Sequence, residues 1–254
     1  IFKQFIVKET TKHIIITILI WLAVAILGGY CIFSIIMFGT KEKEYICRNI
    51  IIDIDDKYNF INEEDITNVL KEKKLYPINK TISHKEADKI EKALGKMSLS
   101  KDVECYMGDS TLYIDITQRK PVYRVFSNNE SYYIDSERKT MPTSRNFTAK
   151  VPIVLGHVDK IQASEEIYDL VMYLESDKYW NTLFKQIYIT DNKEIILISK
   201  QGIKEILLGN MSEYKEKLST LKKWYEQYPE RNCDTLYSRI NLKYENLIYC
   251  TRKK

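Results

Sequence analysis

The chain has 254 residues and a formal net charge of +4, with 39 lysines and arginines against 35 aspartates and glutamates. These charges are interspersed along the sequence, which excludes the concentrated basic surface of a nucleic-acid-binding protein. Only 8 glycines and 5 prolines are present, so long flexible linkers are not expected. The length leaves room for one large folded domain or two small ones beside any targeting segment.

The first predicted element is a membrane-spanning helix from Ile14 to Phe38. No Lys, Arg, Asp or Glu lies between Lys12 and Lys41. At 1.5 Å per residue the run is about 37 Å long, enough to cross a hydrocarbon core of ~30 Å. A cleaved signal peptide has a shorter apolar region and a small-residue cleavage site. We therefore predict a single span, preceded by a short arm at residues 1–13.

Charge alone does not orient this span. Lysines at positions 3, 8 and 12 precede it, and Lys41, Lys43 and Arg48 follow it, so the positive-inside count is equal on the two sides. The side on which the folded part lies has to come from another argument.

Residues 45–118 are predicted to form a β-α-α-β-β module. A β-branched strand around residues 46–55 comes first. Asn62 with Asp65, and Ser83 with Glu86, have the spacing of capping boxes that begin two helices. Two alternating strands then follow, joined by a turn at Gly108–Ser110. We expect these elements to form one small domain.

Residues 119–251 are predicted to form an antiparallel β domain with helices packed on one face, followed by a basic tail at 252–254. Strands are expected at 121–126, 131–135 and 150–156, a helix from Ala163 to Lys178, and a three-stranded meander at 184–209. A second helix follows at 211–230. Two closing strands, Arg239–Glu245 and Asn246–Thr251, are expected to pair across a tight reversal. The predicted fold class is α+β.

The sequence offers no catalytic, cofactor or metal site. Its three histidines are His13, His84 and His157, and none has metal-ligand spacing with Cys, Asp or Glu. Phosphate-binding and nucleophile-elbow motifs are missing from the sequence. His157 with Asp159 is a possible acid–base pair, but an ordinary loop histidine explains it better. We therefore predict no enzyme and no cofactor. The five cysteines show no disulfide-framework spacing.

Several short motifs occur in a fixed order along the folded part. They are Gln118–Val122, Tyr133–Asp135 with Met141–Pro142, Pro152–Gly156, Leu207–Asn210 and Arg239–Tyr244. With one span and a β-α-α-β-β module of the POTRA type, this order resembles the FtsQ/DivIB family of bacterial cell-division proteins. The tyrosine-rich, proline-poor sequence suits a Bacteroidetes-type member. Arg138 stands where the family usually has glycine, so the turn there departs from the family pattern.

The resemblance implies a scaffold of the division machinery rather than an enzyme. It implies a cytoplasmic arm, one span of the cell inner membrane, a POTRA-like domain at 45–118 and a periplasmic β domain at 119–251. It implies location at the septum and binding of an FtsB-like (DivIC) protein with FtsL through the C-terminal strands. Other divisome membrane proteins are expected to contact the span and the POTRA-like domain. No nucleic acid and no small-molecule substrate are implied.

Carried over by motif, the resemblance places the partner-binding residues at the C-terminus. They are Lys243, Tyr244, Asn246, Leu247 and Tyr249 on the receiving strands, with Gly209 on another part of the same surface. The chain departs from the family at the last aromatic position, where it has Tyr249–Cys250 and no tryptophan. A competing interpretation makes Leu242, Tyr244 and Leu247 core residues, with the basic tail blunting the edge of the sheet. The alternative function is a POTRA-containing envelope chaperone or secretion component, which normally carries several POTRA repeats.

Overall fold

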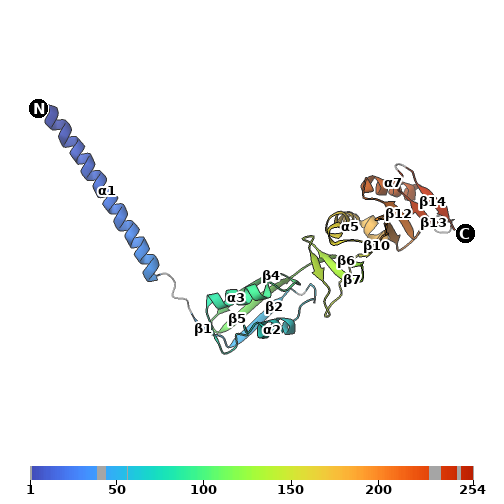
Figure 1. The fold of residues 1–254 in the computed structure, drawn as a ribbon, viewed down its shortest axis with the longest axis horizontal. Coiled ribbons are helices and arrows are strands. Elements are labelled where there is room, and N and C mark those ends of the chain that lie inside the picture. The colour runs from blue at the N-terminus through green and yellow to red at the C-terminus, as the bar shows by residue number, and fades with distance from the viewer. Residues whose placement is uncertain (1, 39–43, 56, 229–235, 245–246, 254) are drawn as a thin grey trace.

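The computed structural model describes residues 2–38, 44–55, 57–228, 236–244 and 247–253. Helix α1 (Phe2–Phe38) is one continuous helix (Figure 1). Its stretch Ile16–Ser34 has a mean hydropathy of 2.4, and none of that stretch is buried against the rest of the protein. Within the described residues, α1 is the one helix that is long and apolar enough to cross a membrane.

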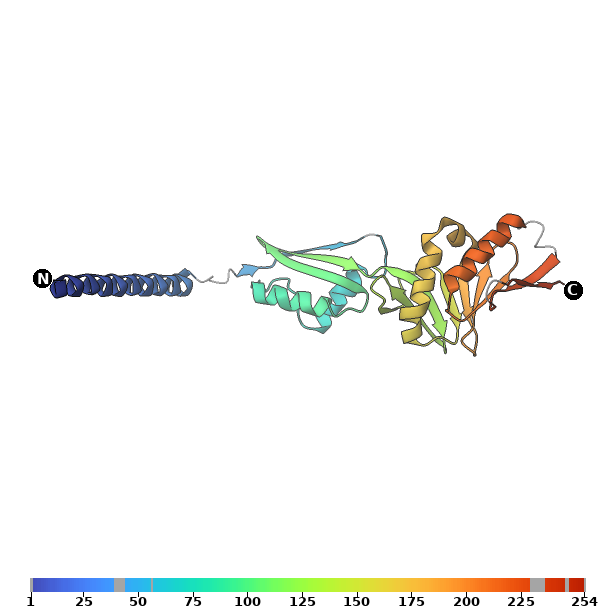
Figure 2. The ribbon, with the colours of Figure 1, turned by 90° about the horizontal axis from the view of Figure 1, so that it is seen from above.

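Beyond α1, the chain folds into a small unit in which two helices cover one face of a three-stranded sheet (Figures 1 and 2). Its elements are β1 (Tyr45–Ile46), β2 (Asn49–Ile54), α2 (Glu63–Glu72), β3 (Thr81–Ile82), α3 (His84–Leu94), β4 (Ser100–Gly108) and β5 (Thr111–Gln118). The sheet order is β2-β5-β4, with β2 parallel and β4 antiparallel to β5. The predicted β-α-α-β-β order is confirmed; the two-residue strands β1 and β3 add a small separate pair.

Both helices of this unit begin where the sequence predicts. Asn62 accepts a hydrogen bond from the Asp65 N–H at 2.8 Å, and the Asp65 carboxylate accepts one from the Asn62 N–H at 3.1 Å. The Glu86 carboxylate accepts from the Ser83 N–H at 2.7 Å. These bonds satisfy N–H groups that a helix start leaves without partners. The inner face of α3 buries Ala87, Ile90 and Leu94.

The second unit is built on a nine-stranded sheet. Its strands are β6 (Pro121–Ser127), β7 (Glu130–Asp135), β8 (Thr140–Pro142), β9 (Ile153–Gly156), β10 (Phe184–Ile189), β11 (Ile195–Ser199), β12 (Glu205–Gly209), β13 (Tyr237–Asn241) and β14 (Tyr249–Arg252). Their order across the sheet is β14-β13-β12-β11-β10-β9-β6-β7-β8. The α+β class is confirmed, but the sheet is mixed: β6–β9, β9–β10 and β12–β13 are parallel pairs.

Two helical crossovers account for two of the parallel pairs. One runs from β9 to β10 through α4 (Lys160–Gln162), the π-helical turn η1 (Ala163–Ile167), α5 (Tyr168–Ser176) and α6 (Lys178–Leu183); the other runs from β12 to β13 through α7 (Tyr214–Gln227). A strand that returns through a helix lies parallel to the strand it left. In Figure 2, α5 and α7 lie on the same face of the sheet. The predicted packing of helices on one face is therefore confirmed.

The helix predicted from Ala163 to Lys178 starts earlier and stops earlier. The Asp159 side chain accepts from the Gln162 N–H at 2.8 Å, so helical structure begins at Lys160. The Asp177 side chain accepts from the Tyr179 N–H at 2.8 Å and starts α6. Asp177 itself has an extended backbone, which separates α5 from α6.

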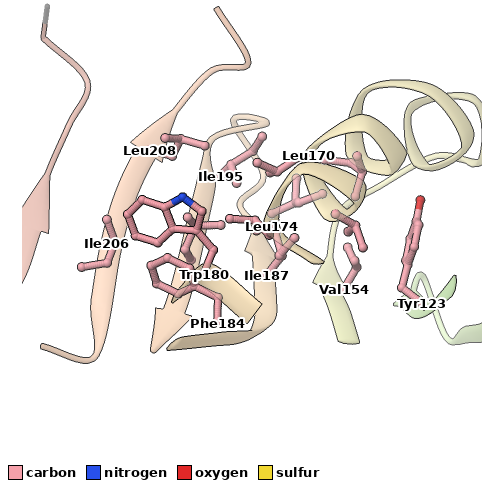
Figure 3. Close-up of a cluster of buried hydrophobic side chains, with 14 of the residues drawn as sticks. Tyr123, Val154, Leu170, Leu174, Trp180, Phe184, Ile187, Ile195, Ile206 and Leu208 are labelled. Carbon is pink, nitrogen blue, oxygen red and sulfur yellow. The ribbon is translucent and has the colours of Figure 1, made fainter. Parts of the chain in front are cut away.

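The main core lies between these helices and the sheet (Figure 3). Trp180 stacks on Phe184 with ring centroids 5.7 Å apart and planes 18° apart. Leu170 and Leu174 of α5 are buried in the same cluster as the strand residues Ile187, Ile206 and Leu208 (Figure 3). At about 25 cal/mol per Å² of apolar surface removed from water, such a core supplies most of the stability of the unit.

A smaller core joins the two units. Phe60, from the loop between β2 and α2, is fully buried against Tyr133 of β7 at a centroid distance of 5.7 Å and against Phe147 at 5.2 Å. Met141 of β8 and Ala149 complete this cluster. The Ser144 hydroxyl also donates to the Phe60 carbonyl at 2.7 Å.

Polar contacts complete this junction. The Gln118 side chain accepts from the Ile61 N–H at 3.0 Å and donates to the Asp55 carbonyl at 2.7 Å. The Arg119 guanidinium pairs with the buried Asp135 carboxylate at 3.0 Å and donates to the Thr140 carbonyl at 3.0 Å. Gln118 therefore fixes the segment of the POTRA-like unit that leads to Phe60. Arg119, which also donates to the Ser98 carbonyl at 3.2 Å, joins the two units.

Arg138 takes up the conformation that a glycine would have at this turn. Its φ is +63°, in the left-handed region. The guanidinium lies 2.6 Å from the Asp169 carboxylate and 4.4 Å from the centre of the Tyr168 ring. The turn geometry is therefore kept despite the departure from the family pattern, and the side chain adds a contact with α5.

Candidate partner-binding surface

The last strand, β14, forms one edge of the nine-stranded sheet. It pairs antiparallel with β13 on one side, with Arg239 opposite Thr251 and Asn241 opposite Tyr249. The Lys253 N–H donates to the Leu236 carbonyl at 2.9 Å, on the β13 side. Because backbone groups alternate along a strand, the N–H of the neighbouring Arg252 points to the open side. This edge presents a row of backbone groups to which another strand can bind.

The chain between β13 and β14 differs from the prediction. The two closing strands pair as expected but are shorter towards each other, because β13 ends at Asn241 and β14 begins at Tyr249. The predicted tight reversal at Glu245–Asn246 lies outside the described residues. The Asn241 side chain accepts from the Lys243 N–H at 2.9 Å, a local turn that takes the backbone out of the strand. Leu242, the residue directly after Asn241, is buried, and its N–H donates to the Leu207 carbonyl at 2.8 Å.

Three of the predicted partner-binding residues lie together beside this edge. Tyr244 and Leu247 belong to the connection rather than to a strand, and Tyr249 begins β14. Their exposed fractions are 56%, 53% and 53%. The rings of Tyr244 and Tyr249 meet edge to face with centroids 5.4 Å apart. We call these three residues the edge patch; Asn246 lies outside the described residues.

The competing interpretation, that Tyr244 and Leu247 are core residues, is wrong for both of them. Leu242 alone of the three proposed core residues is buried, at 2% exposed. Large aromatic and aliphatic side chains that stay more than half exposed beside an open edge are typical of binding surfaces.

Gly209 and Lys243 are brought together by the fold. Gly209, the last residue of β12, has a φ of +80°, and a Cβ added to it would lie 2.9 Å from the Lys243 Cγ. The Lys243 ammonium pairs with the Glu194 carboxylate. This hydrogen bond raises the pKa of Lys243 above its usual value. The lysine side chain therefore passes over Gly209 and ties the connection to the residue before β11.

A small cavity adjoins the edge patch. It has a volume of about 220 Å³. The residues that line it come from α7 with its N-cap and from the β13–β14 connection: Glu213, Glu216, Lys217, Thr220, Leu242, Tyr244 and Leu247. The α7 residues were missed by the sequence analysis, because nothing in their spacing shows that the start of α7 lies beside residues 242–247.

The candidate acid–base pair is not formed. The His157 imidazole lies 2.7 Å from the Asp191 carboxylate, and both side chains are more than half exposed. Asp159 instead caps α4. Among the described residues, no three His, Cys, Asp or Glu side chains gather as a metal site would require.

The architecture therefore defines a class: a protein with one helix suited to a membrane, a POTRA-type unit and a β unit with an exposed edge. A family model described as FtsQ/DivIB, C-terminal related, matches residues 120–251. A model described as POTRA-like domain matches residues 45–117. The first match covers just over half of the chain, and the chain belongs to the FtsQ/DivIB family. Its role is in cell division, its partners are proteins of the divisome, and the family is of the non-enzymatic scaffold type.

Several solved structures match the chain. One of them is POTRA1-2 of the periplasmic domain of Omp85 from Anabaena, with 9% sequence identity and a TM-score of 0.27. The similarity covers 62% of this chain and 95% of that one. At this score the likeness supports no argument about the present chain. No curated protein matches the sequence.

Proposed function

We propose that this chain is a division scaffold of the septum that binds an FtsB-like (DivIC) protein, in complex with FtsL, by adding a partner strand to β14. The open edge of β14 beside the edge patch is the observation that carries this proposal. In strand addition, main-chain hydrogen bonds supply affinity and neighbouring side chains supply selectivity. Both components are available here: an outward backbone N–H at Arg252, and the exposed side chains of Tyr244, Leu247 and Tyr249.

The position of the β14 edge in the cell depends on helix α1. We propose that α1 crosses the cell inner membrane with the N-terminal arm in the cytoplasm and both folded units in the periplasm. Six residues separate the end of α1 from β1, so the POTRA-like unit stays within about 25 Å of the membrane surface. The junction core around Phe60 and Tyr133 then holds the β unit in a defined position relative to the POTRA-like unit.

The backbone part of the proposal is tested with Arg252→Pro. Proline removes an outward N–H from β14 without removing a bond to β13. We expect the full-length chain in detergent to lose retention of the FtsB-like protein and FtsL by at least tenfold, with an unchanged circular dichroism spectrum. Arg252→Ala is the matched control: it removes the same charge, keeps the N–H and should bind as wild type. Equal binding by the proline and alanine variants would overturn strand addition.

The side-chain part is tested with Tyr244→Lys and Leu247→Lys. Both positions are more than half exposed, so the variants should remain folded, while a charge facing an apolar partner surface should abolish partner pull-down. Normal binding by these folded variants would sink the site assignment. A fluorescent fusion of the full chain should form a midcell band; uniform envelope signal would contradict a septal role. A chaperone would instead bind unfolded outer-membrane clients, with no effect of Arg252→Pro.

A further inference from the structure

The cavity beside the edge patch has the size of a single side chain. Pockets for small-molecule ligands have volumes of about 300–1,000 Å³, and this one has about 220 Å³. Such a volume matches one long side chain of a partner rather than a separate metabolite.

The walls of the cavity are of two kinds. Leu242, Leu247 and the ring of Tyr244 form an apolar wall on the side of the β13–β14 connection. Glu213 and Glu216, at the start of α7, form a second, acidic part of the lining. An aliphatic stem suits the first wall, and a positive charge suits the second. An aromatic face such as that of Tyr244 adds attraction for a cation.

The charges on the glutamate wall are not used elsewhere among the described residues. Neither Glu213 nor Glu216 has an ion-pair partner in that part of the chain. Lys217, the cation that also lines the cavity, is 9% exposed and donates to the Leu208 carbonyl at 3.3 Å and to the Asn210 side chain at 3.1 Å. Its ammonium is directed to the loop after β12.

The location of the cavity connects it to the proposed strand addition. Tyr244 and Leu247 belong both to the edge patch and to the cavity wall. Tyr249 begins β14 and touches Tyr244 through their rings. A residue that flanks a strand added to β14 at this end is therefore within reach of the cavity, whereas residues near Arg252 at the other end of the strand are not.

We propose that this cavity binds a lysine or arginine side chain of the partner that adds a strand to β14. The inference rests on the proposed function and extends it from backbone pairing to a specific side-chain preference. The aliphatic stem lies against Leu242 and Leu247, the charged end meets Glu213 and Glu216, and Tyr244 covers the mouth. Charge at this position selects the partner segment and sets its register on the edge.

The first experiment measures the affinity of the full-length chain in detergent for the complex of the FtsB-like protein and FtsL. Glu213→Gln with Glu216→Gln should lower the affinity about tenfold and flatten its dependence on salt, because screened charge pairs are removed. Glu226→Gln, an exposed glutamate near the other end of α7, is the matched control and should leave both unchanged. Unchanged affinity and salt dependence in the double variant would overturn the inference.

The second experiment is a charge swap. Glu216→Lys should weaken binding, and replacing the partner's lysines and arginines one at a time by glutamate should restore it at one position only. Restoration at no position would contradict a single bound cation. The two failures are separable: if Arg252→Pro abolishes binding but the glutamate variants do not weaken it, strand addition stands and the cation pocket is wrong. If the wild-type chain does not bind the complex, the proposed function fails and the pocket inference fails with it.

Discussion

The two ends of the nine-stranded sheet are treated differently by the fold. At one end, β8 is three residues long, ends in Pro142 and places Met141 in a core shared with the POTRA-like unit. At the other end, β14 leaves the edge patch more than half exposed. Natural proteins protect sheet edges by proline, short strands or a cover. The β8 end has a proline and a cover, whereas the β14 end, also a short strand, has exposed aromatic and aliphatic groups beside it. This contrast supports the proposal that a partner binds at the β14 end.

The largest effect is expected at the covered end. Phe60→Ala should lower the free energy of unfolding by about 3–5 kcal/mol, the range for emptying a buried aromatic site. Phe60 is fully buried and touches rings from the second unit. Urea unfolding followed by circular dichroism and tryptophan fluorescence measures the change. A loss below about 1 kcal/mol would show that the junction does not couple the two units.

A smaller effect is expected beside the open end. Gly209→Ala should cost about 1–3 kcal/mol, because alanine is strained at a φ of +80° and its Cβ would press on the Lys243 side chain. Adding Lys243→Ala should recover part of this loss, since it removes the close contact but not the backbone strain. Thermal unfolding of the two variants and of Lys243→Ala alone gives the comparison. Equal stability of Gly209→Ala and wild type would contradict the positive φ of Gly209 and its close approach to Lys243.

The stability of the covered end should also depend on pH, through Glu137 between β7 and β8. The hydrogen bond from Lys139, with that from Lys101 of β4, lowers the pKa of Glu137 from 4.5 to about 2. A lowered folded-state pKa means that the contribution is complete above pH 4.5 and is lost as the pH falls towards 2. The group is exposed, so the effect should be modest.

The variant Glu137→Gln isolates this contribution. Wild type should melt at a higher temperature than Glu137→Gln at pH 6, and the two melting curves should converge near pH 2. Lys101→Met removes only the ion pair from the POTRA-like unit. At pH 6 its melting temperature should lie between those of wild type and Glu137→Gln. A difference that grows on acidification would have the wrong sign and would rule out the ion pair as its source.

The smallest effect on stability is expected in the edge patch itself. Tyr249→Ala should change the free energy of unfolding by no more than about 0.5 kcal/mol, because the side chain is more than half exposed. It should nevertheless weaken binding of the FtsB-like protein and FtsL at least tenfold, as loss of an interface tyrosine does. A destabilised Tyr249→Ala variant would place this residue in the core and remove the contrast between the two ends.

Local signals in the sequence predicted the helices and most of the strands. The capping pairs Asn62–Asp65 and Ser83–Glu86 act within one helical turn, so their spacing is sufficient to locate a helix start. The apolar run of α1 is likewise a local property. The ends of β13 and of α5 were misplaced because single side chains, Asn241 and Asp177, redirect the backbone by hydrogen bonds that strand or helix periodicity does not reveal.

The candidate site was predicted only in part. Tyr244, Leu247 and Tyr249 were identified from a motif and lie together on the surface, yet the motif did not show that Tyr244 and Leu247 lie between the two strands rather than on them. Glu213 and Glu216 were not identified at all. They reach the site because β12 and β13 are parallel neighbours joined through α7, a long-range arrangement that no short stretch of sequence encodes.

By itself, the sequence determined the apolar helix near the N-terminus, the order of the folded units and the motif residues. These depend on local hydropathy, spacing and turn chemistry. Only the tertiary structure decided that Arg119 and Phe60 join the units, that the β8 end is covered and the β14 end open, and that Lys243 crosses Gly209 to reach Glu194. Those features depend on strand register and on contacts between residues far apart in the chain, which form together when the two units pack.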